Sequence, residues 1–373
     1  MSSRSSRVAR GRSGPVRGVS PGLTSSVPTP GPGGAEVSAA ATLSRGVPIA
    51  RFDTLDRRIA AAMQLNGRAT WREIGQLLGS SEFTIGRRAR RLMDRGLVRV
   101  TAAADPVLTG SGHPVLVQMV CQPDKASAVA RALMRRPDVR FVTMVTGPFD
   151  VVAELIVTSS RELANILIDD IGRLDGVTRT TTGSVMRNFK TSDQWGQDVL
   201  GLQRPPGAGA RPPRDGCPSP LDPVDQLIVG LLRMDGRCGY QKLGTAVGLS
   251  ESAVRRRVES LMGSGCLTFP TIVDAQFLGY DVELMMWLHV EVSRLEEVAT
   301  ALARRVEVRY ISATSGYGDL VAEVILRSQS DLYRFRAEVL GAQRGIRQAD
   351  LALELYTLKR AYLEFTRDHS RSQ

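Results

Sequence analysis

The feature that most constrains the fold of this chain is an internal duplication with a constant spacing of 169 residues, the difference between Asp225 and Asp56. The same spacing links these further pairs: Gly67-Arg68 with Gly236-Arg237, Ser81 with Ser250, Arg87-Arg88 with Arg256-Arg257, Leu92 with Leu261, Gly96 with Gly265, Gly147 with Gly316, Asp150 with Asp319, and Lys190 with Lys359. This period is far longer than one supersecondary unit, so it does not indicate a solenoid. The chain therefore contains two copies of one larger unit.

Length and charge restrict the class of protein. The 373 residues are 42% apolar, which suits two to four folded domains. The formal net charge of +11 and the pI of about 10.1 favour a polyanionic partner, of which nucleic acid is the commonest. The alternative is an arginine-rich proteome from a GC-rich genome, which raises the pI of unrelated proteins too.

Four cysteines bear on the compartment: Cys121, Cys217, Cys238 and Cys266. None forms a C-x-x-C pair or has a histidine at zinc-ligand spacing, so we expect no disulfide framework, no metal and no cofactor. The sequence has no run of about 18 apolar residues and no apolar signal segment. We therefore expect a reduced, cytoplasmic protein that does not span a membrane.

Composition also marks the domain boundaries. Residues 1–48 are rich in Ser, Gly, Pro and Arg without apolar periodicity, and we expect a disordered basic tail there. Prolines are concentrated between 196 and 220, which predicts a linker. The expected domains are a tail (1–48), a first helix-turn-helix (52–100), a first small α+β domain (101–195), the linker (196–220), a second helix-turn-helix (221–269) and a second α+β domain (270–365).

The second copy has the clearer pattern of three short helices. Pro223 suits the first turn of the first helix, Tyr240–Val247 predicts the second, Gly248 makes a turn, and Ser250 suits the N-cap of the third. The inner stripe of the third helix is Val254, Val258 and Leu261, and its outward residues are Glu251, Ser252, Arg255, Arg256 and Glu259. A glycine turn followed by an arginine-bearing third helix predicts a helix-turn-helix that reads the major groove. The alternative is a three-helix bundle whose arginines merely face solvent.

The first copy repeats this pattern less cleanly. Ser81 caps its third helix, but Gly86 replaces Arg255 at an expected outward position, and Ser80 replaces the apolar Leu249. Whether this first reader helix still binds DNA stays open. The candidate DNA-contacting residues are Ser250, Ser252, Arg255, Arg256 and Arg257 in the second copy, and Ser81, Phe83, Thr84, Arg87 and Arg88 in the first.

These motifs resemble the N-terminal helix-turn-helix of the Lrp/AsnC family of transcription regulators. The carrying motifs are L-D-x-x-D at Leu221–Asp225, G-R at Gly236-Arg237, and S-x-x-x-V-x-x-R-V at Ser250–Val258. With the domains that follow, the resemblance covers about 52–195 and 221–365. It implies two tandem units in which a DNA-binding head precedes a domain that binds small effectors, typically amino acids, and drives assembly into homo-oligomers.

After the third helix, each copy has the β-α-β-β-α-β pattern of a ferredoxin-like domain. The last strands are predicted at Val177–Val185 and Ala349–Leu355. The fold class is therefore α+β, with two copies of a (winged) helix-turn-helix followed by a ferredoxin-like domain. One face of each antiparallel sheet must be buried, so we expect the two sheets to pair, either within one chain or between chains.

The loop between the second and third strands is the candidate effector site. It reads G-x-x-D in both copies, with Gly147 and Asp150 in the first and Gly316 and Asp319 in the second. Glycine lets a backbone approach a ligand, and a carboxylate can bind an ammonium group. The alternative is a plain hairpin turn, where Gly and Asp are common. The effector role is implied by the family resemblance.

Two other classes of function remain as alternatives. Tandem units of this type also resemble sirohaem decarboxylases, which carry a histidine near the second and third strands; the segments 147–155 and 316–324 have none. No catalytic triad, phosphate loop or metal cluster is visible in the sequence, so we predict no enzyme. We expect His289 to be a core residue. The remaining alternative is an assembly protein that has lost DNA binding.

Overall fold

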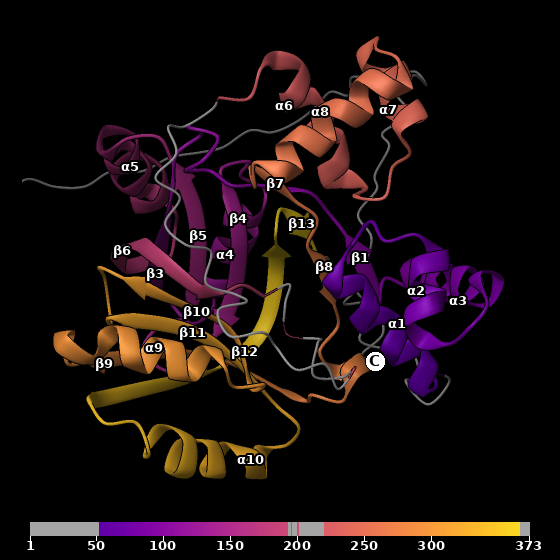
Figure 1. The fold of residues 1–373 in the computed structure, drawn as a ribbon. Coiled ribbons are helices and arrows are strands. Elements are labelled where there is room, and N and C mark those ends of the chain that lie inside the picture. The colour runs from indigo at the N-terminus through magenta and orange to yellow at the C-terminus, as the bar shows by residue number, and fades with distance from the viewer. Residues whose placement is uncertain (1–51, 193–194, 196–199, 201–219, 366–373) are drawn as a thin grey trace, which may run out of the picture. The chain divides into compact units, whose positions relative to one another are not determined.

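Each repeat begins with a head of three short helices (Figure 1). They are α1 (Thr54–Leu65), α2 (Trp71–Leu78) and α3 (Glu82–Asp94) in the first repeat, and α6 (Pro223–Met234), α7 (Tyr240–Val247) and α8 (Glu251–Gly263) in the second. The computed structural model describes residues 52–192, 195, 200 and 220–365. The predicted tail and nearly all of the predicted linker, with Cys217, lie outside the described residues.

Side-chain caps determine where these helices begin. The Asp222 carboxylate accepts from the Asp225 amide ahead of Pro223, and the Ser250 hydroxyl accepts from the Ala253 amide. Gly248 adopts a left-handed φ of 71° after α7, a conformation that glycine reaches without steric cost. The predicted second helix and the predicted Ser250 cap are therefore confirmed.

Short strands join the two heads to each other. In antiparallel pairs, β1 (Val98–Val100) lies beside β8 (Thr271–Val273), and β2 (Ala103–Ala104) beside β7 (Leu267–Thr268). One hydrophobic core runs through both heads and includes Ile59, Leu92, Ile228 and Val258. Since neither head buries this surface alone, the pair behaves as one packing unit.

Each head is followed by the predicted β-α-β-β-α-β domain. The first consists of β3 (His113–Cys121), α4 (Ala126–Met134), β4 (Val139–Val145), β5 (Val151–Val157), α5 (Ser160–Asn165, continued by a π-turn at Ile166–Asp170 and a 3-10 turn at Ile171–Arg173) and β6 (Val177–Lys190). The second consists of β9 (Val282–Val290), α9 (Leu295–Ala303), β10 (Val308–Thr314), β11 (Leu320–Leu326), α10 (Gln329–Arg334, continued by a π-turn at Phe335–Leu340), β12 (Ile346–Arg360) and β13 (Leu363–Glu364). The α+β fold class is confirmed.

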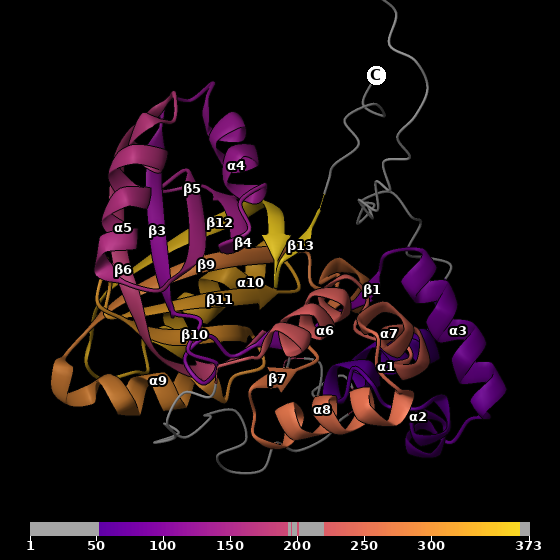
Figure 2. The ribbon, with the colours of Figure 1, turned by 90° about the horizontal axis from the view of Figure 1, so that it is seen from above.

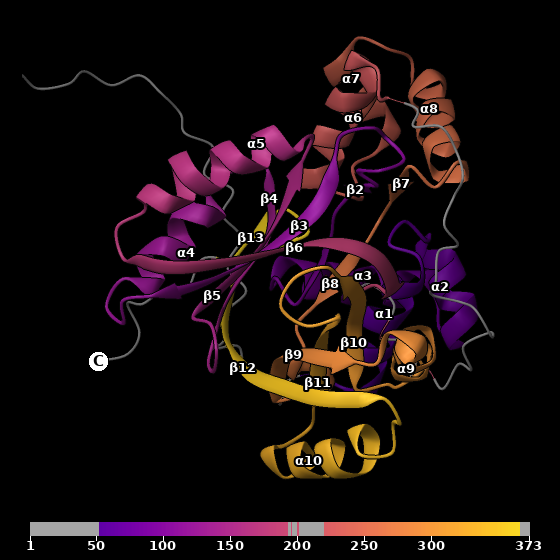
Figure 3. The ribbon, with the colours of Figure 1, turned by 90° about the vertical axis from the view of Figure 1, so that its left-hand side faces the viewer.

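The last strand of each domain belongs to both sheets (Figure 3). The first half of β6 pairs with β3 and its second half with β10; β12 pairs first with β9 and then with β4. The strand order β12-β4-β5-β3-β6-β10-β11-β9 thus closes on itself, with β13 attached to β12. The predicted ends at Val185 and Leu355 were too early, because the halves that cross over carry polar residues that hid the strand pattern.

Three cores hold the two domains together. Helices α4 and α5 cover the outer face of the first sheet, and α9 and α10 cover that of the second (Figure 2). The inner faces enclose a mixed core in which Phe149 meets Trp287 edge to face, with ring centroids 5.4 Å apart. The expected pairing of sheets therefore occurs within one chain.

Two glycines allow the sheets to approach at one crossing. A Cβ built on Gly316 would lie 2.8 Å from the Cα of Gly183 and 3.0 Å from its nitrogen. Both neighbouring atoms are backbone, so they cannot rotate away as a side chain would. The contact requires glycine for close approach, although Gly316 does not have a positive φ.

We expect Gly316→Ala to lower the free energy of unfolding by about 1–3 kcal/mol, the usual cost of overpacking a close contact. Gly230→Ala is the matched control, because Gly230 lies inside α6 with nothing within 4 Å of an added Cβ. That change should stabilise the protein by about 1 kcal/mol through helix propensity. Urea unfolding of both variants measures the two changes in the free energy of unfolding. No change for Gly316→Ala would contradict the requirement for glycine at this crossing.

Candidate nucleic-acid interface and small-molecule sites

Helix α8 exposes the side chains that were predicted to read DNA. Ser252, Arg255 and Arg256 are all exposed. Arg255 forms an ion pair of 2.9 Å with Glu251 one turn earlier and lies over the Tyr240 ring of α7, 5.2 Å from its centroid. Because that ion pair is exposed at both ends, it is weak, and a base or phosphate can replace the carboxylate.

Helix α3 presents a different surface. Ser81 caps it through the Thr84 amide, 3.2 Å away, and also donates to the Thr84 hydroxyl. Phe83 in its first turn is 80% exposed, and Arg87 is exposed in the next turn. Single exposed apolar side chains are common on protein surfaces. Phe83 is a candidate contact because it lies in the first turn of the third helix, the part of a helix-turn-helix that faces base edges.

Arg88 and Arg257 occupy a different environment from their neighbours. Arg257 Nη1 lies 2.6 Å from Asp222 and 3.0 Å from Asp225, and Arg88 makes the same two contacts with Asp53 and Asp56. In both heads these contacts raise the pKa of the arginine, and hydrogen bonding lowers the pKa of Asp53 and Asp222. Both arginines were predicted to contact DNA, which stays a prediction; in the structure they form ion pairs with carboxylates at the start of the first helix of each head.

Gly86 does not project outward, which corrects the prediction. It is buried, and a Cβ there would lie 3.1 Å from the ring of Trp71 in α2. The second repeat has Tyr240 and Arg255 at the two equivalent positions, where the guanidinium covers the smaller ring. The glycine therefore accommodates a larger aromatic residue, and α3 forms in full despite it.

Two arginines from the G-R motifs clasp the heads together. Arg68 donates to the carbonyl oxygens of Gly236 (2.6 Å) and Cys238 (3.1 Å), and Arg237 donates to those of Gly67 (2.6 Å) and Ala69 (2.8 Å). Each also lies over an aromatic ring of the other head: Arg68 over Tyr240 and Arg237 over Trp71. Burial and the nearby Arg68 lower the pKa of Arg237 to about 10. This reciprocal arrangement, the arginine clasp, fixes the placement of one reader against the other.

The G-x-x-D loops place both aspartates at strand ends. The carboxylates of Asp150 and Asp319 each accept from a backbone amide at 2.7 Å, that of Cys121 and that of Val290. Asp319 is also 3.9 Å from the Arg347 guanidinium of β12. Gly147 has a positive φ of 87°, which favours glycine in a turn. Gly316 has no positive φ, and glycine is needed there because the backbone of Gly183 lies against it. The first loop thus has the features of a hairpin turn, and the second adds a cation beside its carboxylate.

His289 lies next to this second loop. It is half-buried at the end of β9, so the prediction of a core histidine is wrong. Its ring meets that of Tyr317 edge to face, with centroids 5.5 Å apart, and the Tyr317 hydroxyl donates to Asp350. The segment 316–324 contains no histidine, but the neighbouring strand supplies one, which sequence proximity alone could not reveal.

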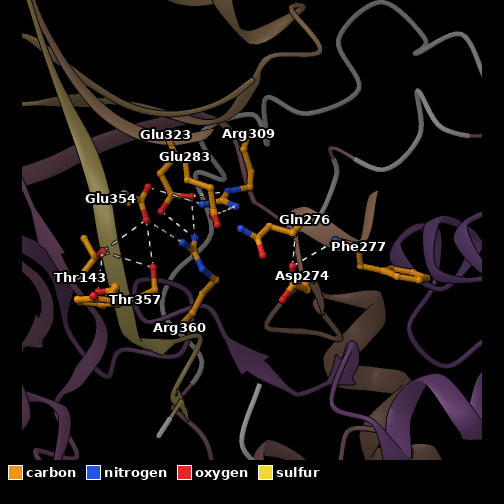
Figure 4. Close-up of polar contacts among 11 residues, drawn as sticks. Thr143, Asp274, Gln276, Phe277, Glu283, Arg309, Glu323, Glu354, Thr357 and Arg360 are labelled. Atoms are coloured by element: carbon orange, nitrogen blue, oxygen red, sulfur yellow. Dashed lines mark hydrogen bonds and ion pairs between the residues drawn. The ribbon is translucent and has the colours of Figure 1, made fainter. Parts of the chain in front are cut away.

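A buried charge cluster inside the closed sheet was missed at the sequence level (Figure 4). Arg309 donates to Glu323 (2.8 Å) and Glu283 (2.6 Å), while Arg360 pairs with Glu323 (2.6 Å) and Glu354 (3.4 Å). A charged residue inside an otherwise apolar strand, such as Glu323 in LVAEVIL, is the sequence signal that could have revealed the cluster. The first repeat has only the equivalent pair Arg140 and Glu154.

The three carboxyl groups of the cluster differ in pKa. Burial and the neighbouring Glu323 raise the pKa of Glu354 to about 7. Burial opposes ionisation of Glu283 and Glu323 too, but Arg309 and Arg360 outweigh it and lower the pKa of both. One of the three carboxylates therefore keeps its proton up to about pH 7.

Other chemistry is limited in the part of the chain that the structure describes. Within it, no group of three or more His, Cys, Asp or Glu side chains is placed to hold a metal. Cys121, Cys238 and Cys266 are free and buried, and burial raises the pKa of Cys121 to about 11, which makes it a poor nucleophile. None of the described helices is long and apolar enough to cross a membrane.

Paired helix-turn-helix heads on a ligand-binding type of α+β domain define a class, that of DNA-binding regulators. Two family models match the chain, each twice: the AsnC-type helix-turn-helix domain at 52–93 and 221–262, and the Lrp/AsnC ligand binding domain at 115–195 and 283–363. An uncharacterized HTH-type transcriptional regulator of Pyrococcus furiosus is 31% identical over 146 residues, 39% of this chain and 96% of that protein. The HTH-type transcriptional regulator FL11 of Pyrococcus horikoshii is 33% identical over 141 residues, 38% of this chain and 93% of that protein. The chain belongs to the Lrp/AsnC family of transcriptional regulators.

Among solved structures, the siroheme decarboxylase NirDL is similar over nearly the whole chain. The match has a TM-score of 0.58 and covers 84% of this chain and 95% of that one, with 14% sequence identity. At this identity the likeness shows a shared tandem fold.

We expect Arg237→Ala to weaken binding to DNA that carries both half-sites by about tenfold. The change removes two hydrogen bonds and a cation–π contact from the arginine clasp, which together hold the heads in register. Binding to DNA with one half-site should stay within about twofold, since no reader side chain changes. Fluorescence anisotropy with the two DNAs checks this, with Arg68→Ala as the symmetric partner; equal losses on both DNAs would contradict a clasp.

We expect the effect of Glu354→Gln on the free energy of unfolding to be more favourable at pH 8 than at pH 5. Between pH 4.5 and 7 the folded state keeps a proton on Glu354 that the unfolded state releases, so this group's contribution to stability falls as pH rises through that window. The difference between the two pH values should be about 3 kcal/mol. Urea unfolding at both pH values measures it. Glu323→Gln is the control, because its lowered pKa predicts destabilisation at pH 8.

Proposed function

We propose that one chain binds one operator with two different reader helices. The observation that carries this proposal is the joining of the two heads inside the chain, through the β1–β8 pair and the arginine clasp. A helix-turn-helix dimer reads two half-sites because its symmetry presents two readers. Here α3 and α8 supply both readers without a second chain.

The two readers differ at equivalent positions, so the operator is an imperfect palindrome. Phe83 in α3 corresponds to Ser252 in α8, and Gly86 corresponds to Arg255. An exposed phenylalanine suits the methyl group of a thymine, whereas serine and arginine suit hydrogen-bonding base edges or phosphates. We assign DNA contacts to Ser81, Phe83, Thr84 and Arg87 in the first reader and to Ser250, Ser252, Arg255 and Arg256 in the second.

A small zwitterionic effector such as an amino acid is proposed at the G-x-x-D loops. Asp319 would receive the ammonium group and Arg347 the carboxylate, since the two side chains lie 3.9 Å apart and Arg347 is 62% exposed. The first loop, with Gly147 and Asp150, has Thr178 in place of that arginine and would bind more weakly. Effector binding would shift the domains and so change DNA affinity.

Assembly of chains into homo-oligomers is part of the proposal, as is a cytoplasmic location with the DNA. Helix α6 supports assembly, because Leu227 (60%) and Met234 (69%) are exposed on it together with Leu231. Light scattering distinguishes heads that pair on one operator within one chain from heads that pair between chains. A monomer that binds the full operator at low concentration supports pairing within one chain.

A second candidate function is a tetrapyrrole enzyme on the same fold. It is favoured by the similarity to siroheme decarboxylase NirDL, which has also been solved in co-complex with an iron-uroporphyrin III analogue, and by the position of His289 beside Tyr317. Absorbance titration with iron uroporphyrin tests it, since a shifted absorption band that His289→Ala abolishes would support this alternative. A pure assembly protein would bind neither DNA nor the tetrapyrrole.

Selection of bound fragments from genomic DNA tests the DNA-binding proposal. Wild type should enrich discrete sites with two unequal halves. Arg256→Ala should lose one half of the motif and Arg87→Ala the other, each with about 1–3 kcal/mol of binding. Phe83→Ser, which gives the first reader the residue of the second, should remove a thymine preference from one half alone.

Arg257→Ala serves as the structural control, because Arg257 is bound to Asp222 and Asp225. It should lower the melting temperature along with DNA binding, whereas Arg256→Ala should leave the melting temperature unchanged. Enrichment of no sites by wild type beyond salt-sensitive, sequence-independent binding would reject the regulator function.

A further inference from the structure

A cavity of about 320 Å³ lies beside the buried charge cluster, where both repeats contribute to its wall. Glu283, Arg309, Glu354 and Arg360 line it from β9, β10 and β12. Helix α4 and the segment after β8 complete it. Figure 4 shows the acidic and basic side chains converging from these strands.

The cluster has one carboxylate more than it has guanidinium groups. Among the described residues, Glu283, Glu323 and Glu354 form ion pairs only with Arg309 and Arg360. Arg131 and Asp274, which also line the cavity, add one charge of each sign. Buried charges must be paired, so a structure with a surplus carboxylate needs a proton or a cation. A proton on Glu354, whose pKa is raised to about 7 by burial and by Glu323, meets this need up to about pH 7.

Hydrogen bonding in the cluster is incomplete as well. Glu354 Oε1 and Arg309 Nη2 are buried, lie 3.7 Å apart and have no hydrogen-bond partner among the described residues. Within the same residues, Glu283 accepts only from Arg309 Nη1, and its side chain is 22% exposed. Glu283 is thus the carboxylate that an entering group reaches first.

Apart from Ser127, Arg131, Asp274 and Thr357, the remaining wall is mainly apolar. It includes Met134, Met144, Val273, Ala275, Leu358 and Phe365. Apolar walls with a few convergent polar groups are typical of small-molecule sites, and 320 Å³ lies at the lower end of their usual size.

We propose that this cavity binds an organic amine, with its ammonium group on Glu283 and the carboxylate cluster, and its apolar or aromatic body against the methionine- and leucine-lined wall. The ammonium supplies the missing positive charge and donates up to three hydrogen bonds. A neutral or anionic molecule of the same shape would leave the surplus carboxylate unpaired. The site is distinct from the G-x-x-D loops and does not depend on DNA binding.

The duplication provides an internal comparison. A second cavity of about 410 Å³ occupies the equivalent place in the other half and includes Arg140 and Glu154. It has Pro114 where this one has Glu283, Val185 in place of Glu354, and Thr191 in place of Arg360. Its lining also includes Glu323 and Arg360 of the charge cluster. The three carboxylates that line it (Asp105, Glu154 and Glu323) are matched in number by three arginines (Arg140, Arg187 and Arg360), so we expect the amine to bind at one cavity alone.

Calorimetric titration of the full chain tests the site with 2-phenylethylamine as the probe, and with 2-phenylethanol and 3-phenylpropionate as the neutral and anionic comparisons. We expect saturable 1:1 binding of the amine alone. Binding near pH 7 should release protons, because an ammonium favours the ionised form of Glu354. The charged groups that act on Glu354 are Glu283, Glu323, Arg309 and Arg360, and the hydroxyls of Thr143 and Thr357 donate to it. Affinity should therefore be at least about tenfold higher at pH 8 than at pH 5.5.

Glu283→Gln keeps the shape of the side chain and should weaken amine binding about tenfold or more. Glu154→Gln is the matched control in the other cavity and should leave affinity within about twofold. The comparison of the three probes on the wild-type protein needs no variant. It therefore tests the preference for an amine even if Glu283→Gln fails to fold. Equal affinity for amine and alcohol, no saturable amine binding, or equal losses in both variants would overturn the proposal.

Discussion

The crossing of β6 and β12 from one sheet to the other is the constraint on which the rest of the structure depends. Each strand completes the sheet of its own repeat and then hydrogen-bonds to the neighbouring one. Neither domain can therefore close its sheet alone, and the inner faces around Trp287 become a shared core. The buried charge cluster also depends on this crossing, since Glu354 and Arg360 lie on the half of β12 that has left its own sheet.

The sequence predicted those features that depend on local chemistry. Caps such as Ser250, turns such as Gly248 and the duplication itself led to correct helices and the correct class of domain. It could not reveal contacts with distant partners. The carboxylates that bind Arg257 lie 32 and 35 positions earlier, so its ion pairs were not visible in the local pattern. Gly86 was wrongly predicted to be exposed, because Trp71 approaches it from another helix. The DNA and effector contacts themselves stay predictions.

Duplication within one chain has allowed the two copies to diverge. In the heads, a glycine under Trp71 replaces the arginine that covers Tyr240. In the domains, one end of the closed sheet holds a five-residue charge cluster and the other a single ion pair. An ordinary dimer cannot differ in this way, because each substitution would appear in both halves. The fused chain has kept the pseudo-twofold contacts, including the arginine clasp, while its two halves have taken different side chains.

The covalent link between the heads also changes how operator occupancy depends on the concentration of this protein. A regulator that must first dimerise fills its operator in proportion to the square of its concentration when it is scarce. Two readers on one chain remove that step, because the second head is always present at a high effective concentration. In the proposed mode, in which one chain binds one operator, occupancy then rises linearly with the number of molecules, and random fluctuations in synthesis are transmitted without amplification.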